Sequence, residues 1–239
     1  MHIARVSFEI DRVVMPLKKM GVGKIYLISK TKEQKVRLKY FLKSEQILTI
    51  ELDIHNFKGI MSELCALIKK EKSQKSNVFI NISSGGKLFA SAATIACMMY
   101  DATPYYVVPE EYKIHGEDFY ENGKTLGLSS GMKDIIDIPK YTITPPPKEF
   151  IQVLKILQNG SMKQKDIIKE LNNSGVMQKV YDAKNKNKIL KKAYMEFRRN
   201  YLQPLLDKGL IKKEGQSRKQ KITITEEGLN TLNIFGKVY

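Results

Sequence analysis

A short run of small and cationic residues offers the clearest chemistry in the sequence. Residues 81–90 read Asn-Ile-Ser-Ser-Gly-Gly-Lys-Leu-Phe-Ala, a turn of small residues followed by an apolar helical pattern. Glycines let the backbone approach a ligand closely, and the N–H groups at a helix start favour an anion. Lys87 would add a charged donor. The spacing matches neither G-x-G-x-x-G nor G-x-x-x-x-G-K-[ST], so a purely structural turn remains the alternative.

A second polar run, residues 7–12, follows the first apolar segment. Asp11 is predicted to be the N-cap of a helix, and Glu9 and Arg12 either contact a ligand or form an ion pair in solvent. No spacing of His, Asp or Cys matches a metal cage, so we expect no metal and no cofactor. Cys65 and Cys97 lie in helical patterns and are expected to be buried thiols.

Alternating elements must position these loops. Apolar and β-branched runs predict strands at 3–8, 24–29, 47–54, 77–83 and 104–108, with a last strand at 134–138. Helical faces between them contain Leu38, Phe41 and Leu42; Ile60, Leu64, Leu67 and Ile68; and Leu88, Ala92, Ile95, Ala96 and Met99. This order predicts an α/β fold with a doubly wound, mostly parallel Rossmann-like sheet. Such sheets bind ligands beyond the carboxyl ends of their strands.

Composition indicates a globular protein with a polyanionic partner. The 239 residues are 28% charged and 42% hydrophobic, which excludes a disordered, collagen-like or disulfide-rich chain. Lys and Arg number 41 against 25 acids, and residues 145–239 hold 20 of the bases but 9 of the acids. The Pro145–Pro147 run therefore divides domain 1–144 from a basic domain 145–239. Without a leader or membrane-spanning pattern, we expect a cytoplasmic protein with no membrane partner.

The basic half predicts an α+β winged helix-turn-helix, against the alternative of a generic helical domain. A first helix is indicated by Phe150, Val153, Leu154 and Leu157, and a second, with inward Ile167, Ile168 and Leu171, by the capping box Ser161–Gln164. A third is predicted from Leu190, Tyr194, Phe197 and Tyr201, with Pro204 kinking or ending it near Leu202. A hairpin with a basic tip and a closing helix follow.

This scheme predicts a duplex DNA interface. The candidate contacts on the helices are Lys163, Gln164, Lys186, Asn187, Lys188, Lys191 and Lys192, and those on the wing are Arg218, Lys219 and Lys221. Lysines at phosphates give affinity without sequence preference, whereas the amide of Asn187 can pair with adenine. Any single lysine could equally be a solvated charge, and Arg198 and Arg199 could serve dimer or backbone contacts.

Both halves resemble one family. Residues 81–90 resemble, without a gap, the N-I-[ST]-G-G-T-K-[LM]-[MF]-[AS] loop of CARF domains, the CRISPR-associated Rossmann folds that sense cyclic oligoadenylates. The opening HIARVSFEIDRVVMPL, the proline linker and the basic winged helix resemble archaeal CARF–winged-helix regulators. The chain departs from the loop pattern where Ser84 replaces a usual Gly and Gly86 a frequent Thr, changes that bear on ligand size and affinity.

The resemblance implies a ligand site shared by two protomers. Its first loop would consist of Ser7, Phe8, Glu9 and Arg12, and its second of Ser83, Ser84, Gly85, Gly86 and Lys87. The implied ligand is a cyclic oligoadenylate, with cyclic tetra-adenylate as the expected ring. The implied assembly is a homodimer in which both sets of loops line one pocket on the two-fold axis.

Three functions follow as hypotheses. The first is a transcription regulator linked to CRISPR-type defence, in which the ligand changes DNA binding. The second is a ring nuclease that slowly cleaves its ligand without a metal, with Lys87 as candidate cationic donor; no His or carboxylate pair marks a dedicated enzyme, which we do not expect. The third is a DNA-binding protein that needs no ligand.

Overall fold

The protein divides into two compact units, Met1–Thr144 and Pro145–Tyr239. The computed structural model describes residues 1–5, 9–21, 23–28, 47–112, 120–121, 124–125, 129–178, 180–181, 189–216 and 220–239. The helix expected around Leu38–Leu42 lies outside the described residues. Among the described helices, none combines the length and the apolar character needed to cross a bilayer.

The first unit is built on one mixed sheet. Its strands are β1 (His2–Arg5), β2 (Ile25–Ile28), β3 (Ile47–Ile50), β4 (Phe79–Asn81), β5 (Thr103–Val108) and β10 (Asp134–Asp137), in the order β10-β5-β4-β1-β2-β3. All pairs are parallel except β10 with β5. The predicted doubly wound, mostly parallel sheet is confirmed, although most strands are shorter than their apolar runs. Strands are added to the sheet on one side of β1 up to β3 and on its other side from β4 onward, so the ligand crevice of such folds is expected at the carboxyl ends of β1 and β4.

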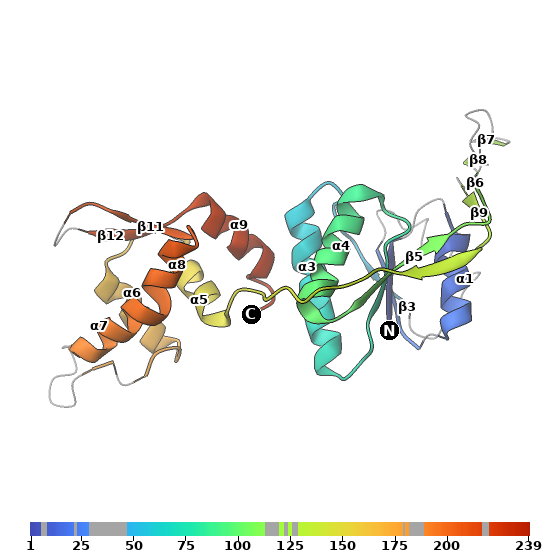
Figure 1. Ribbon diagram of the computed structural model, residues 1–239. Helices are drawn as coiled ribbons and strands as arrows, with labels where there is room; N and C mark the ends of the chain where they lie inside the picture. Colours follow the sequence, from blue (N-terminus) through green and yellow to red (C-terminus); the bar gives the residue numbers. More distant parts are fainter. Residues whose placement is uncertain are drawn as a thin grey trace. The chain divides into compact units, whose positions relative to one another are not determined.

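Helices cover both faces of this sheet. Figure 1 shows α1 (Asp11–Met20) on one face and α3 (Phe57–Ser73) with α4 (Gly86–Tyr100) on the other. Cys65 and Cys97 are buried free thiols between these layers, as expected, and burial raises the pKa of each to about 12. Both are therefore inert thiols at neutral pH.

The buried face of α4 differs from the predicted one. Its buried residues are Phe89, Ala92, Ala93, Ala96 and Cys97. Leu88 is 45% exposed, and Ile95 and Met99 are half-buried. The predicted face is therefore rotated about the helix axis, because Phe89 rather than Leu88 packs beneath the turn that begins the helix.

The start of α1 also corrects the sequence-based expectation. Ile10, not Asp11, is the N-cap residue, because its carbonyl oxygen accepts bonds from the N–H groups of Val13 and Val14. The Asp11 carboxylate instead accepts a hydrogen bond from Gly131 N at 3.0 Å. Gly131 follows the strand β9 (Ser129–Ser130), which pairs with β6 (Glu111–Tyr112). Asp11 therefore fastens this two-stranded ribbon to α1.

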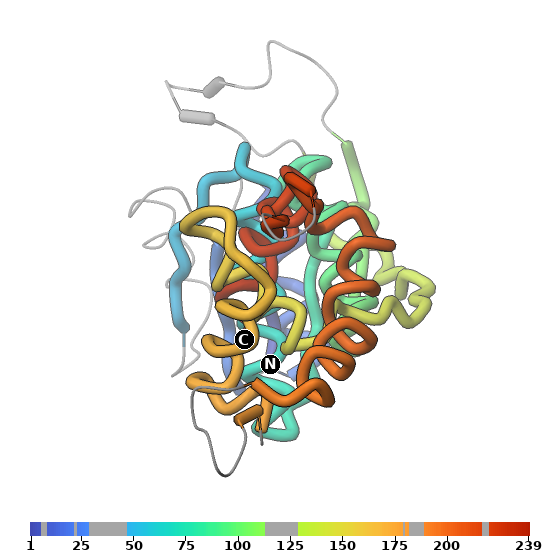
Figure 2. Tube along the Cα trace, turned by 90° about the vertical axis from the view of Figure 1, so that its left-hand side faces the viewer, coloured from blue at the N-terminus to red at the C-terminus, as the bar shows by residue number. Residues whose placement is uncertain are grey.

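The second unit has the winged-helix order of elements. Helices α5 (Lys148–Leu157) and α6 (Gln164–Asn173) come first. The third helix is longer and consists of α7 (Lys191–Phe197), a π segment (Arg198–Leu202) and α8 (Gln203–Asp207). The hairpin β11 (Ile211–Glu214) with β12 (Lys221–Ile224) forms the wing, and α9 (Glu226–Phe235) closes the unit. Figure 2 shows this third helix, from α7 to α8, in orange.

One local prediction in this unit is wrong. Ser161 does not cap α6: the N-cap position is Lys163, and Met162 forms an antiparallel bridge to Ile222. The residues before α6 are thus held extended against the wing. Pro204 is predicted to kink or end the third helix near Leu202; the helix continues as α8, but its regular part is interrupted by the π segment, which ends at Leu202.

A threonine and a glycine explain how the wing joins α9. The Thr225 hydroxyl donates to Gly209 O at 2.6 Å and accepts from Gly228 N at 3.1 Å, so it caps α9 and ties it to the chain before β11. A Cβ on Gly228 would lie 2.1 Å from the backbone oxygen of Leu210. Only glycine fits at this contact.

Candidate functional site

The glycine-rich turn lies where the sequence placed it, between the end of β4 and the start of α4. Gly85 is the N-cap of α4 with φ +123°, and Gly86 begins the helix with φ +76°. Both angles lie in a region that side chains rarely adopt. A Cβ on Gly85 would also stand 2.7 Å from the Phe89 ring and 2.8 Å from Cδ of Arg5. The first glycine is therefore required by packing as well as by backbone conformation.

Three polar side chains hold this turn against the neighbouring strands. Buried Ser84 donates its hydroxyl to Arg5 O at 2.6 Å, and Ser83 Oγ accepts from Val107 N at 2.6 Å. Asn81, fully buried, donates to Arg12 O at 2.7 Å and accepts from Ser83 N at 2.9 Å. These bonds join the carboxyl ends of β1, β4 and β5 to α1. The two serine hydroxyls thus fix the turn, which leaves its backbone as the surface nearest to a ligand.

Two cations lie at the turn. Lys87 is exposed in the first turn of α4, close to the helix N–H groups that have no intrahelical partner. Arg5, at the end of β1, extends along the glycines: a Cβ on Gly86 would be 4.0 Å from Arg5 Nη1. Burial lowers the pKa of Arg5, yet an arginine stays charged at neutral pH. Sequence analysis did not select Arg5, since one arginine at a strand end forms no motif.

Glu9 and Arg12 form an ion pair, but it is buried rather than solvated. Arg12 is 3% exposed; its Nη1 donates to Glu9 Oε1 at 2.9 Å and its Nε donates to Val107 O at 3.1 Å. The guanidinium lies 4.8 Å from the centre of the Tyr106 ring. Glu9 also accepts a bond from the Ser129 hydroxyl at 2.9 Å. The pair therefore links α1, β5 and the β6–β9 ribbon.

Arg12 Nη2 is buried and has no hydrogen-bond partner among the residues that the structure describes. A buried guanidinium with an open donor suits an anionic or carbonyl acceptor.

Of the predicted first loop, Ser7 and Phe8 lie outside the described residues. The structure thus brings Glu9, Arg12, Ser83, Ser84, Gly85, Gly86 and Lys87 to the carboxyl edge of the sheet. Within the described ranges, no group of three acids, histidines or cysteines could hold a metal.

Of the predicted DNA contacts that the structure describes, the four lysines are exposed and Gln164 is half-buried. Lys163 is the N-cap residue of α6 and half-buried Gln164 its first residue; Lys191 and Lys192 begin α7, and Lys221 begins β12. Lys186, Asn187, Lys188, Arg218 and Lys219 lie outside the described residues. A bridge between Tyr181 and Ile189 brings the chain together on either side of 182–188. The role of all these predicted contacts in DNA binding stays a prediction.

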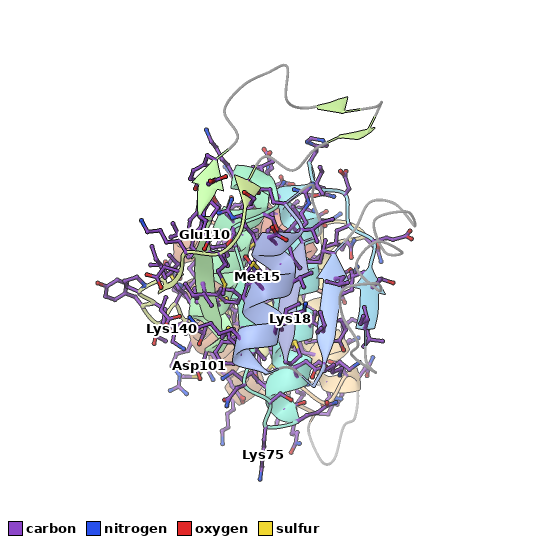
Figure 3. The ribbon with its side chains drawn as sticks, turned by 90° about the vertical axis from the view of Figure 1, so that its right-hand side faces the viewer. Met15, Lys18, Lys75, Asp101, Glu110 and Lys140 are labelled. Atoms are coloured by element: carbon purple, nitrogen blue, oxygen red, sulfur yellow. The ribbon has the colours of Figure 1, made fainter. Side chains whose placement is uncertain are left out.

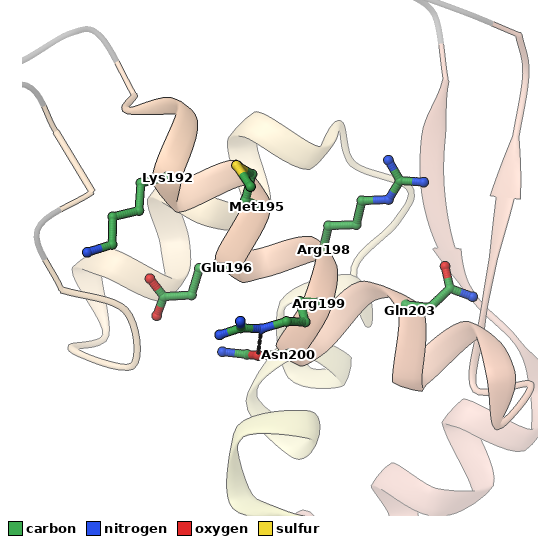
Figure 4. A pocket seen from close by; sticks show the side chains of 7 residues that line it. All are labelled: Lys192, Met195, Glu196, Arg198, Arg199, Asn200 and Gln203. Atoms are coloured by element: carbon green, nitrogen blue, oxygen red, sulfur yellow. Dashed lines mark hydrogen bonds between the residues drawn. The ribbon is translucent and has the colours of Figure 1, made fainter.

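A groove that sequence analysis did not anticipate runs along the third helix. It has a volume of about 740 Å³ and is lined by Lys192, Met195, Glu196, Arg198, Arg199, Asn200 and Gln203 (Figure 4). Met195 is 72% exposed, which is unusual for a large apolar side chain. Arg199 Nε donates to Asn200 Oδ1 at 3.0 Å. The groove therefore combines cationic, amide and apolar groups on one helix.

Family comparisons identify both units. Residues 1–112 match the family described as HFX_2341-like, N-terminal, and residues 149–236 match the DUF6293 C-terminal winged helix domain. No curated protein matches the sequence. The sheet order and the match of the second unit confirm the architecture inferred from the sequence, a Rossmann-like, mostly parallel sheet followed by a winged helix.

Solved structures with similar folds were also found. Can2 from Sulfobacillus thermosulfidooxidans in complex with cyclic tetra-adenylate is 15% identical, with a TM-score of 0.38, over 99% of this chain and 64% of that one. Csm6 from Enterococcus italicus, bound to cyclic hexa-2′-fluoro-hexa-dAMP, is 11% identical, with a TM-score of 0.39, over 86% and 53%. The chain thus spans less than two thirds of the length of either protein.

Proposed function

We propose that this protein, a CARF-type Rossmann domain joined to a DUF6293-type winged helix, is a transcription regulator whose DNA binding depends on a cyclic oligoadenylate. The observation that carries the proposal is the glycine turn at the switch point of the sheet. There the N-terminus of α4 carries Lys87 and lies against Arg5, and Ser83 in the turn is bonded to Val107, whose carbonyl oxygen accepts a bond from buried Arg12. Backbone N–H groups, a helix dipole and fixed cations together suit the phosphates of a nucleotide ring.

The ligand would be held mainly by groups that do not have to move. Positive φ at both glycines and the buried bonds of Ser84 and Asn81 fix the turn before a ligand arrives. Preorganised donors bind more tightly because less conformational freedom is lost. Cyclic tetra-adenylate is the ring to test first, and the sequence resemblance is the reason for that choice.

Two copies would complete the pocket. Along α4, Leu88, Ile95 and Met99 leave apolar surface outside the core of the unit. A second copy packed on this surface would bury it and bring two glycine turns to a two-fold axis, which suits a ring of matching symmetry. Sedimentation of the full chain measures this directly: a monomer at micromolar concentration, with and without ligand, would contradict the shared pocket.

The ligand must bind one conformation of the dimer more tightly if it is to change DNA binding. The test is a pair of titrations with the full chain: calorimetry with cyclic tetra-adenylate, its trimer and its hexamer, and duplex binding with and without the ring. We expect one ring to bind and to change the DNA affinity by roughly five-fold or more. Tight duplex binding with no ring bound would instead identify a DNA-binding protein that needs no ligand.

Slow ring cleavage is the second candidate, and exposed Lys87 beside the start of α4 is the feature that favours it. A ribose 2′-hydroxyl oriented by the turn could attack the adjacent phosphate, forming a 2′,3′-cyclic phosphate, breaking the bond to the 5′-oxygen of the next nucleotide and passing its proton through water to that oxygen, with Lys87 stabilising the added charge. Radiolabelled ring incubated with excess protein decides this. Cleavage by the wild type that is lost in Lys87→Ala supports it, and an intact ring removes it.

A further inference from the structure

The third helix of the winged-helix unit buries five side chains among the described residues. Four of them, Ala193, Phe197, Tyr201 and Leu205, are spaced by four, and the fifth is Leu202 in the π segment. In a regular α-helix each step of four residues turns about 40° past a full circle, so such a row winds around the axis. The π segment Arg198–Leu202, in which Gln203 N bonds to Arg198 O, supplies a wider turn and offsets this drift.

Most of the residues that line the groove form two rows along the sequence of this helix. One row is Met195, Arg199 and Gln203; the other is Lys192, Glu196 and Asn200, again at a spacing of four. These six residues line the groove of about 740 Å³ (Figure 4). Eight residues of helix span about 12 Å, which matches about three base-pair steps of 3.4 Å. The face is therefore long enough to follow one short stretch of a duplex groove.

The side chains in these rows are of kinds that discriminate bases. Arginine pairs with guanine through two hydrogen bonds, asparagine and glutamine pair with adenine, and an apolar group contacts the thymine methyl. In the free protein the Nε of Arg199 is bonded to Asn200 Oδ1 at 3.0 Å. That bond holds the guanidinium in place and leaves its two terminal amino groups for a guanine edge. Lys191, which is in neither row, would neutralise a phosphate, a contact that gives affinity without sequence preference.

We infer that the sequence preference of this protein is set by the middle of its third helix, with Arg199 and Asn200 as the principal base-reading residues. The inference rests on the proposed DNA-binding function. Duplex DNA is the occupant that the charges favour, because residues 145–239 carry 20 basic against 9 acidic side chains. Lys191 and Arg198, seven residues apart on this helix, are exposed and would meet the phosphate backbone. A major groove about 12 Å wide admits a helix presented in this way.

The test is selection of binding sites from a randomised duplex library by the full chain, with and without cyclic tetra-adenylate. Arg199→Lys keeps the charge but loses the two-pronged donor, so we expect the preference for guanine at one position to fall roughly 10-fold or more. Asn200→Ala should relax an adjacent position. The matched control is Lys191→Gln. It should weaken binding to all sequences alike and reduce the slope of log affinity against log salt concentration by about one.

Three results would overturn the inference, and each separates it from the proposed function. If Arg199→Lys and Asn200→Ala keep the wild-type motif while Asn187→Ala changes it, the bases are read from the segment before α7. If the wild type binds every duplex equally, DNA binding stands and base reading by this face fails. If the groove variants alter sedimentation of the protein but not its motif, the face is an interface between two copies. Circular dichroism of each variant verifies that it is folded, and for Lys191, Arg199 and Asn200 the exposure of the side chain makes this the expected result.

Discussion

Replacing Gly85 by alanine tests whether the glycine turn is shaped by packing as well as by backbone conformation. The φ of +123° alone makes alanine costly, by about 1–3 kcal/mol. The added Cβ would also lie 2.7 Å from the Phe89 ring and 2.8 Å from Cδ of Arg5, and crowding of this kind costs a further 1–3 kcal/mol or so. Together we expect a loss of roughly 2–6 kcal/mol in the free energy of unfolding of the first unit.

Gly21 provides the matched control within the same unit. It ends α1 with φ +65°, but nothing lies within 4 Å of a Cβ built on it. Gly21→Ala therefore carries the backbone cost without the crowding. At roughly 3–4 °C per kcal/mol for a unit of this size, Gly85→Ala should lower the melting temperature by several degrees more than Gly21→Ala.

The measurement is thermal unfolding of the full chain followed by circular dichroism, paired with calorimetric titration of cyclic tetra-adenylate. We expect Gly85→Ala to lose the ligand as well as stability, because Phe89 and Arg5 must both shift to admit the methyl group. Gly21→Ala should keep the wild-type affinity. Equal melting temperatures for the two variants would refute the packing argument, and unchanged ligand affinity in Gly85→Ala would place the ligand elsewhere.

Three further outcomes follow from particular side chains. Burial, with the nearby N-terminal amine, lowers the pKa of His2 to about 4, so the unfolded chain binds more protons than the folded protein between pH 6.5 and 4. The free energy of unfolding should therefore fall by up to about 3 kcal/mol as the pH drops through that range. His2→Gln, but not exposed His55→Gln, should flatten the dependence of the melting temperature on pH. Arg5→Gln should weaken cyclic tetra-adenylate about 10-fold in calorimetry, while Lys18→Gln, on the outer face of α1 (Figure 3), should not. Lys140→Gln should leave ligand affinity intact but reduce the effect of the ligand on DNA binding, measured by fluorescence anisotropy.

Much of the fold could be predicted because it depends on patterns that repeat along the chain. Apolar β-branched runs identified the strands, and their alternation with helical segments identified the sheet. The ends of elements were less accessible, since they depend on contacts between distant segments. The Asp11 carboxylate accepts a hydrogen bond from Gly131 N instead of capping its own helix. Met162, just before α6, forms a β-bridge with Ile222. Neither partner is visible from the local sequence.

The candidate site shows the same division. The glycine turn was found because its residue types are characteristic of anion sites. Asn81 and Arg5 were not recognised as determinants of its geometry, because each acts through a bond or contact with a residue far along the chain. The π segment was also missed, although it left one signal: apolar residues at 193, 197, 201 and 205 keep a spacing of four that a regular helix would not bury on one side.

Helix α4 gives the proposed regulation a physical route within the first unit. Its N-terminus is the glycine turn, and its C-terminal end holds the chain that leads to residue 145. Asp101, the C-cap of α4, pairs with Lys140, and Met98 O accepts a bond from Ile143 N at 3.2 Å (Figure 3). The two lysines beside Asp101, Lys140 and Lys72, lower its pKa to about 2, so the carboxylate stays charged wherever the protein is folded. A ligand that shifts the start of this helix would therefore displace the connecting chain with it, since a helix moves as a rigid rod more readily than it bends.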